Sequence, residues 1–314
     1  MLKRLVTGFT GTLMILSVAG GAAAFPDRPV TFVVPFSAGG GTDGVARAFQ
    51  PQFAEALGGD VVVKNTAGAS GTVGAAEAAN AKPDGYTLGF LPIGPATIQP
   101  HLRKLPYDLG SWEFVCNVTS SPVTLMTQKA SSINSLDEMK KAAADAPGKY
   151  VYGSSGPGTI PHLAMAATAD KLGLTMKHVP HKGTANAMKS MAGGVIQYFA
   201  DTPVVLSRYD VKALATFTQE RIPGLENVPT MKELGYDMQF SVWRGIFAPK
   251  GTPADVVAKL DQACKSATES EGFKSFSEKT NTDILYMDSK SFGAFAQAEF
   301  EKNGAILKAA GLKK

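Results

Sequence analysis

The chain has 314 residues, with 31 Lys and Arg against 27 Asp and Glu, for a formal net charge of +4. Its basic residues are scattered rather than clustered, which argues against a nucleic-acid partner. Cys116 and Cys264 are too few for a disulfide scaffold, and the sequence leaves open whether they pair or remain buried thiols. The four histidines have no metal-ligand spacing, so no metal or other cofactor is indicated. The length is sufficient for two domains, each with its own core.

Residues 1–24 have the features of a secretory signal peptide. Lys3 and Arg4 form a basic start, residues 13–18 form an apolar centre, and residues 22–24 are small alanines before Phe25. The alternative is a membrane anchor, but the apolar run is shorter than the ~20 residues that a spanning helix needs. The sequence therefore predicts export, and a periplasmic location, for a mature chain that starts at Phe25.

Short β-branched or aromatic runs alternate with helical patterns along the rest of the chain. The predicted strands are 30–34, 60–64, 86–91, 150–152, 175–179, 197–200 and 211–217. The predicted helices are one through Ala46 to Leu57, and then 72–81, 136–144, 162–172, 185–191, 253–268, 272–278 and 289–309. Ser135 with Glu138 is typical of a helix N-cap. The alternation predicts parallel strands joined by crossover helices. The fold class is α/β, with two Rossmann-like lobes in tandem, a helical tail and an interlobe cleft as the binding site.

Two glycine-rich loops occupy equivalent places in the two predicted lobes. Residues 36–42 and 153–159 each follow a strand and precede a helix, where ligands of open α/β sheets bind. A helix N-terminus offers free N–H groups and partial positive charge, so both loops are candidate sites for one carboxylate. The candidate ligand residues on these loops are Phe36, Ser37, Ala38, Gly39, Gly40, Thr42, Ser154, Ser155, Gly156 and Thr159. The alternative is ordinary turn chemistry, with glycines at positive φ and hydroxyl side chains as caps.

Several sharper motifs do not fit these loops. The first loop lacks the lysine of a nucleoside-triphosphate loop, and neither loop has the dinucleotide pattern G-x-G-x-x-G with a later acid. The segment GSSGPG also fails the G-x-S-x-G pattern of a nucleophile elbow. A secreted hydrolase with Ser155 as nucleophile, His162 or His181 as base and Asp201 as the acid is kept as an alternative.

The sequence resembles the periplasmic substrate-binding proteins of tripartite tricarboxylate transporters, the Bug or TctC-like family. The resemblance rests on FPDRPVTFVVPFSAGGGTD, VVVKNTAGASGTVGA, PDGYTL, HLRKLPYD, GSSGPGTIPHLA, HVPHKG, NVPTMKELG and WRGIFAPKGTP, which follow in family order over nearly all of the mature chain. It implies two lobes that close over a small organic carboxylate, with 25–124 plus 247–314 as lobe one and 125–246 as lobe two. It also implies a monomer without enzymatic activity that serves membrane permease subunits. A partner of a membrane sensor is the alternative.

Three positions depart from the family pattern. His181 and Lys182 stand where Tyr and Arg or Lys are common, Gln197 stands where Asp is frequent, and Arg244 stands between Trp243 and Gly245 where uncharged residues are more usual. Arg244 is either a solvent-facing arginine paired with a surface acid or a second anion site across the cleft. The second interpretation would select a dicarboxylate, with an aromatic or medium-length molecule favoured.

Other candidates have structural alternatives as well. Phe36, Tyr198 and Trp243 are candidates to line the site, although core packing is favoured for the last two. His101 and His181 are candidate donors to a second carboxylate, against a structural role for each. An acid in the pocket would instead favour an amino acid, through its ammonium group. Asp43 and Asp201 are the candidates, although Asp43 also suits a cap at the start of its helix.

Overall fold

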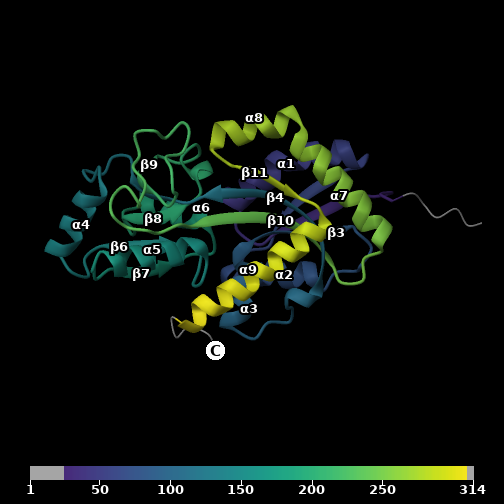
Figure 1. Ribbon diagram of the computed structural model, residues 1–314, viewed down its shortest axis with the longest axis horizontal. Helices are drawn as coiled ribbons and strands as arrows, with labels where there is room; N and C mark the ends of the chain where they lie inside the picture. The colour runs from purple at the N-terminus through teal and green to yellow at the C-terminus, as the bar shows by residue number, and fades with distance from the viewer. Residues whose placement is uncertain (1–24, 310–314) are drawn as a thin grey trace, which may run out of the picture.

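The computed structural model describes residues 25–309, so the predicted signal peptide lies outside the described residues. Figure 1 shows two α/β lobes side by side, with long strands passing between them. Among residues 25–309, no helix combines the length and the apolar character needed to cross a bilayer.

Lobe one is built on a six-stranded sheet with the order β11-β4-β10-β3-β1-β2. Its strands are β1 (Val30–Val34), β2 (Val61–Asn65), β3 (Thr87–Pro92), β4 (Trp112–Pro122), β10 (Ser241–Pro249) and β11 (Ile284–Met287). Its helices are α1 (Gly41–Leu57), α2 (Thr72–Ala79), α3 (Gln99–Leu102), α7 (Ala254–Glu269), α8 (Glu271–Thr280) and α9 (Ser289–Ala309). Short helical segments cover Ala69–Gly71, Gly94–Ile98 (a π-helix) and Leu109–Ser111.

Lobe two is built on a five-stranded sheet with the order β7-β6-β8-β5-β9. Its strands are β5 (Thr124–Gln128), β6 (Val151–Ser154), β7 (Lys177–Pro180), β8 (Tyr198–Asp201) and β9 (Val211–Thr216). Its helices are α4 (Leu136–Asp145), α5 (Ile160–Lys171) and α6 (Thr184–Ala192), with a short 3₁₀ segment at Pro203–Val205. The predicted N-cap of α4 is confirmed, because the Ser135 hydroxyl accepts the N–H of Glu138 at 3.1 Å.

Each of the two sheets contains a core of parallel strands, which the alternation predicted correctly. β1 pairs in parallel with β2 and β3, and β6 pairs in parallel with β7 and β8. The alternation did not predict β4, β5, β10 or β11, and β9, which it did predict, pairs in antiparallel rather than parallel orientation. β10 is antiparallel to β3 and β4, and β5 is antiparallel to β8 and β9, because the chain reverses direction where it passes between the lobes. β10 belongs to the first sheet over its whole length, starting at Ser241.

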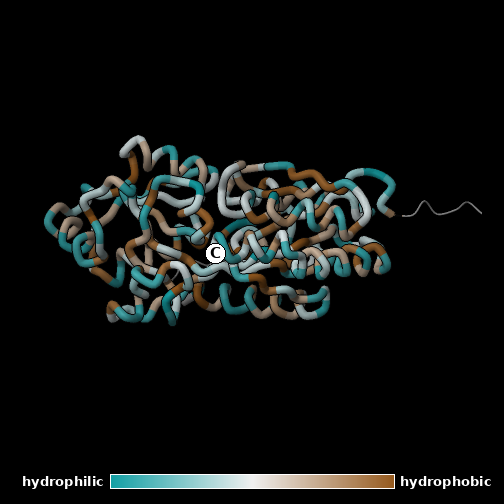
Figure 2. The backbone as a smooth tube through the Cα atoms, turned by 90° about the horizontal axis from the view of Figure 1, so that it is seen from above, coloured by the Kyte–Doolittle hydropathy of each residue, from teal (hydrophilic) through white to brown (hydrophobic). Residues whose placement is uncertain are grey.

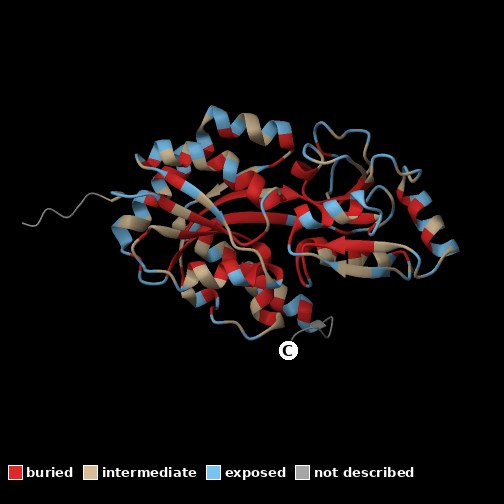
Figure 3. Cartoon of the chain, turned by 180° about the vertical axis from the view of Figure 1, so that it is seen from behind, coloured by how far each residue is buried: buried red, intermediate tan, exposed pale blue. Residues whose placement is uncertain are grey.

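Aromatic side chains fill both faces of the first sheet. Phe32, Phe49 and Phe53 pack between the sheet and α1, with ring centroids 5.1 to 6.5 Å apart. On the other face, Trp243 and Phe292 bring α9 against the sheet, with ring centroids 5.8 Å apart. Figure 3 shows the strands of both sheets largely buried, while Figure 2 shows hydrophilic and hydrophobic stretches alternating along the outer helices, as amphipathic helices require.

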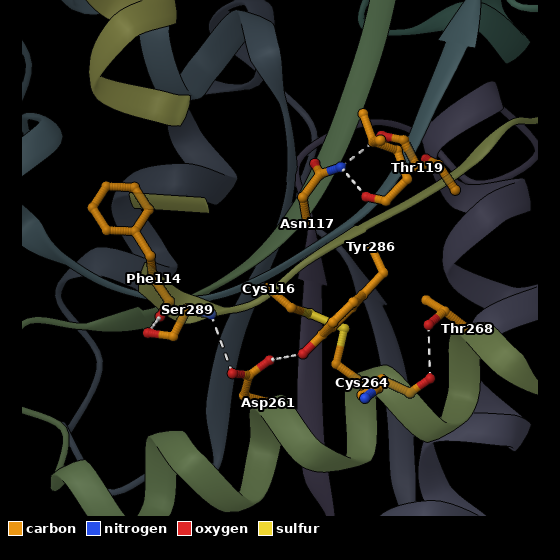
Figure 4. The surroundings of a disulfide bond; sticks show 11 residues. Phe114, Cys116, Asn117, Thr119, Asp261, Cys264, Thr268, Tyr286 and Ser289 are labelled. Atoms are coloured by element: carbon orange, nitrogen blue, oxygen red, sulfur yellow. Dashed lines mark hydrogen bonds between the residues drawn. A yellow bond between two sulfur atoms is a disulfide. The ribbon is translucent and has the colours of Figure 1, made fainter. Parts of the chain in front are cut away.

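Cys116 and Cys264 form a disulfide, which settles a question that the sequence left open. The bond joins β4 to α7, and both cysteines are fully buried (Figure 4). Beside it, the Asp261 carboxylate accepts the Tyr286 hydroxyl at 2.7 Å and the Ser289 N–H at 3.1 Å. This corner therefore ties α7, β11 and the start of α9 to the edge of the sheet.

Candidate functional site

A pocket lies between the two lobes and is lined by residues of both. Three glycines line it together with polar and apolar side chains. The glycines are Gly40, Gly41 and Gly94. The polar lining residues are Thr42, Ser155, Thr159, Thr184, Asp201 and Arg244. The apolar lining residues are Phe36, Pro92, Ile93, Pro95, Ile160, Pro161 and Val242.

The N-terminus of α1 reaches the pocket directly after β1. Gly40 is the N-cap residue in an extended conformation, and no side chain caps the helix. Gly39 has a φ of +84°, which favours glycine in the turn that precedes the helix. Without a side-chain cap, the first N–H groups of α1 are left available to an anion in the pocket.

Asp43 stabilises this turn from inside the helix. Its carboxylate accepts the Gly39 N–H at 2.8 Å and pairs with Arg47 at 2.9 Å. Burial acts to raise the pKa of Asp43, but hydrogen bonds from Arg47, Gly39 and Asn65 outweigh it and hold the pKa below its usual value. Asp43 therefore remains ionised and occupied within its own helix, and it does not line the pocket.

The second loop brings α5 to the opposite side of the pocket. Thr159 is the N-cap residue, again without a side-chain cap, and Gly156 and Gly158 have φ values of +123° and +73°. The side chains of Ser155 and Thr159 line the pocket. The Thr159 hydroxyl donates to the Gly156 carbonyl at 2.7 Å, which closes the turn.

A third helix N-terminus, that of α6, also lies at the pocket. Gly183 is its N-cap residue, with a φ of +146°, and Thr184 lines the pocket. The sequence analysis did not identify Thr184. A signal for it existed, because Gly183-Thr184 at the start of α6 repeats the Gly-Thr pair found at the first residues of α1 (Gly41-Thr42) and just before α5 (Gly158-Thr159). Each of these three uncapped helix N-termini contributes partial positive charge at the pocket.

Arg244 lies on β10 with 1% of its surface exposed, so the interpretation as a solvent-facing arginine was wrong. Its guanidinium donates to the hydroxyls of Thr42, Ser121 and Thr202 at 3.4, 3.0 and 3.2 Å, and to the Val242 carbonyl at 3.3 Å. These partners are all neutral, and no carboxylate in the described part of the chain forms an ion pair with it. Burial lowers the pKa of Arg244 to about 10, and Asp201 offsets only part of that effect.

Asp201 lies at the end of β8, fully buried, and also lines the pocket. It accepts the Thr184 hydroxyl at 2.5 Å and the Thr202 N–H at 2.7 Å. Burial raises the pKa of Asp201, against the opposing effects of these hydrogen bonds and of Arg244. Asp201 thereby connects the N-terminus of α6 to the site.

The other predicted site residues do not line the pocket. Ser37, Ala38 and Gly39 belong to the first loop, and Ser154 and Gly156 to the second, where they shape the turns. The His101 ring hydrogen-bonds to the Phe300 carbonyl at 2.9 Å and packs at a tilt against the Phe300 ring, so it holds α9 in place. His181 pairs with the Ser190 hydroxyl at 2.8 Å. Tyr198 and Trp243 are core residues, each 1% exposed.

The geometry also tests the hydrolase alternative. The Ser155 hydroxyl pairs with the Thr184 hydroxyl at 3.1 Å and has no histidine partner in the described residues. Ser154 does contact His178, at 2.7 Å, but Ser154 is fully buried and its oxygen also accepts the Gly156 N–H. Among residues 25–309, no carboxylate hydrogen-bonds to His178, so the base of a triad would lack its orienting acid.

The two lobes are in contact around the pocket. The Tyr209 hydroxyl of lobe two donates to the Gly39 carbonyl at 2.8 Å. From lobe one, the Ser70 hydroxyl and the Gln99 amide both donate to the Pro157 carbonyl at 2.9 Å. Together with the bond from Arg244 to Thr202, these contacts describe a closed arrangement in which both lobes surround the site.

Two α/β lobes that close over a pocket lined by helix N-termini define the class of two-lobed ligand-binding proteins. Residues 45–312 match the model of the family described as "Tripartite tricarboxylate transporter family receptor" (TctC). The chain belongs to this family, whose members are substrate-binding proteins that serve a transporter, not enzymes.

Solved structures agree with this assignment. The periplasmic binding protein BugD is 31% identical, with a TM-score of 0.87 over 92% of this chain and 100% of its own. MatC from Rhodopseudomonas palustris with bound malate is 29% identical, with a TM-score of 0.84 over 90% and 100% of the two chains. R. palustris Rpa4515 with adipate is 27% identical, with a TM-score of 0.84 over 91% and 98%. Carboxylates are thus the ligands in two similar structures.

Proposed function

We propose that this protein captures a small dicarboxylate in the interlobe pocket, in the periplasm, and delivers it to the membrane permease subunits of a tripartite transporter. The observation that carries the proposal is Arg244, a buried cation that lines the pocket and has only neutral hydrogen-bond partners. Asp201 offsets only part of the burial effect on Arg244 and does not hydrogen-bond to it, so an anion in the pocket would supply a directly bonded counterion.

The three helix N-termini extend this argument to the rest of the pocket. Each contributes partial positive charge and free N–H donors, and hydroxyl groups stand beside them. Arg244 and the N-terminus of α1 form one end, since the Arg244 guanidinium contacts Thr42. Ser155 and Thr159 at α5 form the other end. Thr184 also lines the pocket, and its hydroxyl contacts that of Ser155. A ligand with a carboxylate at each end would satisfy both.

The position of Arg244 refines the expected arrangement. The arginine stands beside the first loop rather than across the cleft from it, so one carboxylate would be shared between Arg244 and α1, and the second would meet α5. The apolar lining, which includes Phe36, Ile93 and Ile160, suits a hydrocarbon middle, either aromatic or of medium length. Malate and adipate in similar structures support the dicarboxylate class.

The predicted signal peptide and the family support the proposed location and partners. The first 24 residues have the composition of a signal peptide, and BugD is described as a periplasmic binding protein. We propose that the mature protein acts as a monomer, because ligand contacts can come from both lobes of one chain. For this protein, binding and closure would be the whole function.

The test is calorimetric titration of unfolded and refolded, ligand-free protein with a panel of carboxylates. The panel pairs each dicarboxylate with its monocarboxylate analogue and includes acidic amino acids, because Asp201 would favour an ammonium group. We expect tight binding of a dicarboxylate and a loss of about tenfold or more in Arg244→Gln, since a hydrogen bond to a charged group contributes about 1.5–3 kcal/mol. Arg244→Lys should recover only part, because lysine lacks the planar fork.

The matched control is Arg221→Gln, an arginine on the surface of lobe two that pairs with Glu233. This variant should bind as the wild type does. Equal binding of mono- and dicarboxylates would reject the two-ended arrangement, and selective binding of amino acids would assign the ammonium site to Asp201. Absence of binding across the panel would reject the proposed function.

A further inference from the structure

The second ligand loop is held from behind by two histidines that the pocket does not include. The N–H of Gly158 donates to Nδ1 of His162 at 3.1 Å. The N–H of Gly156 donates to the Ser154 hydroxyl at 3.1 Å, and that hydroxyl lies 2.7 Å from Nε2 of His178. Two backbone N–H groups of the loop are therefore linked to an imidazole ring, that of Gly158 by a direct hydrogen bond and that of Gly156 through the Ser154 hydroxyl.

The two rings are themselves packed together. The centroids of His162 and His178 are 4.2 Å apart with an interplanar angle of 27°, and Tyr152 stacks on His178 at 5.0 Å. The three residues come from β6, α5 and β7, so the stack joins the elements that surround the loop. Packing of this kind restricts ring rotation and keeps the acceptor nitrogens pointed at the loop.

The hydrogen bonds require a neutral His162 and favour a neutral His178. Nδ1 of His162 accepts a backbone N–H, so its proton must be on Nε2. Ser154 is fully buried and already accepts the Gly156 N–H, so its single proton is best placed toward His178, which makes Nε2 of His178 an acceptor. Burial lowers the pKa of His162, and it lowers that of His178 to about 4, with smaller effects from His162 and His181. Both rings are therefore neutral near pH 7.

We propose that His162 and His178 are positioning residues, which as neutral acceptors hold the backbone of residues 154–159 in the shape that receives the ligand carboxylate. This inference rests on the proposed function of the loop. Gly156 and Gly158 both have positive φ values, and glycine can adopt many other backbone conformations. A hydrogen bond from each of these N–H groups therefore selects the observed conformation of the loop.

The anchors also serve the closed arrangement. The Pro157 carbonyl, between the two anchored glycines, accepts hydrogen bonds from Ser70 and Gln99 of lobe one. Because hydrogen bonds within lobe two fix Gly156 and Gly158, the Pro157 carbonyl already points toward lobe one before the lobes close. Preorganisation of this kind reduces the conformational entropy lost on binding.

The test compares variants that keep or remove the acceptor. His162→Asn places an amide oxygen near the position of Nδ1, and His178→Gln can reach the position of Nε2. His162→Phe and His178→Phe keep an aromatic ring in the stack but have no acceptor. His101→Phe is the control, because His101 contacts Phe300 and does not touch the loop. Two readouts are measured, namely hydrogen exchange of the Gly156 and Gly158 N–H groups without ligand, and affinity for the carboxylate that the wild type binds.

We expect faster exchange at the anchored glycine in each Phe variant and about tenfold weaker binding, the effect of losing one hydrogen bond. The Asn and Gln variants should recover most of the affinity, which a purely packing role would not produce. Unchanged exchange in the Phe variants, or unchanged affinity despite faster exchange, would overturn the inference. If the wild type binds no carboxylate, the proposed function fails, whereas the exchange experiment still tests whether the histidines hold the loop.

Discussion

Gly41 is the residue at which a single methyl group would intrude most directly on the candidate site. A Cβ atom there would lie 3.1 Å from the Thr202 hydroxyl, 3.4 Å from a guanidinium nitrogen of Arg244 and 3.5 Å from an Asp201 oxygen. Gly41 is helical and does not have positive φ, so the backbone itself accepts alanine. The absence of a side chain at this position therefore concerns the site rather than the helix.

We expect Gly41→Ala to weaken ligand binding about tenfold or more, because the added methyl group would crowd the Thr202 hydroxyl and the Arg244 guanidinium at the site. Calorimetry measures the affinity, and thermal unfolding checks that the variant is folded. Gly193→Ala is the control, because its φ is −82° and the nearest atom to its Cβ would be 3.5 Å away, far from the pocket. Normal binding by Gly41→Ala would place the ligand away from the N-terminus of α1.

At the scale of elements, the disulfide attaches α7 to β4. The paired cysteines are 148 positions apart in the sequence, so the bond closes a long loop and restricts the unfolded chain. Neither cysteine lines the pocket. The bond is therefore expected to affect folding stability and not ligand recognition.

We expect the double variant Cys116→Ala, Cys264→Ala to lose about 2–5 kcal/mol in the free energy of unfolding and to retain ligand affinity. Urea unfolding followed by circular dichroism gives the first quantity, and calorimetry gives the second. A reductant should lower the stability of the unfolded-and-refolded wild type toward that of the variant and leave the variant unchanged. Equal stability of the two proteins would contradict this role.

At the scale of the whole molecule, a few hydrogen bonds outside the pocket join the lobes. Ser70 donates to the Pro157 carbonyl from a strained turn, in which Ala69 and Ser70 have φ values of 45° and 60°. Tyr209 donates to the Gly39 carbonyl. Residues held in this left-handed region cost on the order of 1–3 kcal/mol, and such strain is often found at switch regions.

We expect Ser70→Ala combined with Tyr209→Phe to weaken binding about threefold to tenfold, although neither side chain lines the pocket, because ligand affinity includes the free energy of closure. Small-angle X-ray scattering should show a larger radius of gyration for the ligand-free variant and the wild-type value at saturating ligand. Tyr236→Phe, on the surface of lobe two, is the control. A variant with unchanged affinity and unchanged radius would exclude these bonds as determinants of closure.

Local patterns in the sequence were sufficient for the strand–loop–helix units of both lobes. β1 was predicted at its observed bounds, the N-cap of α4 was predicted from two residues, and both glycine loops were placed at helix N-termini. These features depend on neighbours within a few positions, which periodicity and capping chemistry describe.

Only the tertiary structure decided the composition of the pocket. Arg244 contacts Thr42 from 202 positions away, and its burial on β10 follows from antiparallel pairing with β3 and β4, which no local pattern reports. Thr184 lines the pocket because of the way α6 packs, whereas His101 contacts α9 and lies outside the pocket. Cys116 bonds to Cys264 because α7 packs against β4. Local sequence patterns identified most of the residues that could bind an anion, although not Thr184. Long-range packing decided which of them share one pocket, because burial and charge balance depend on residues distant along the chain.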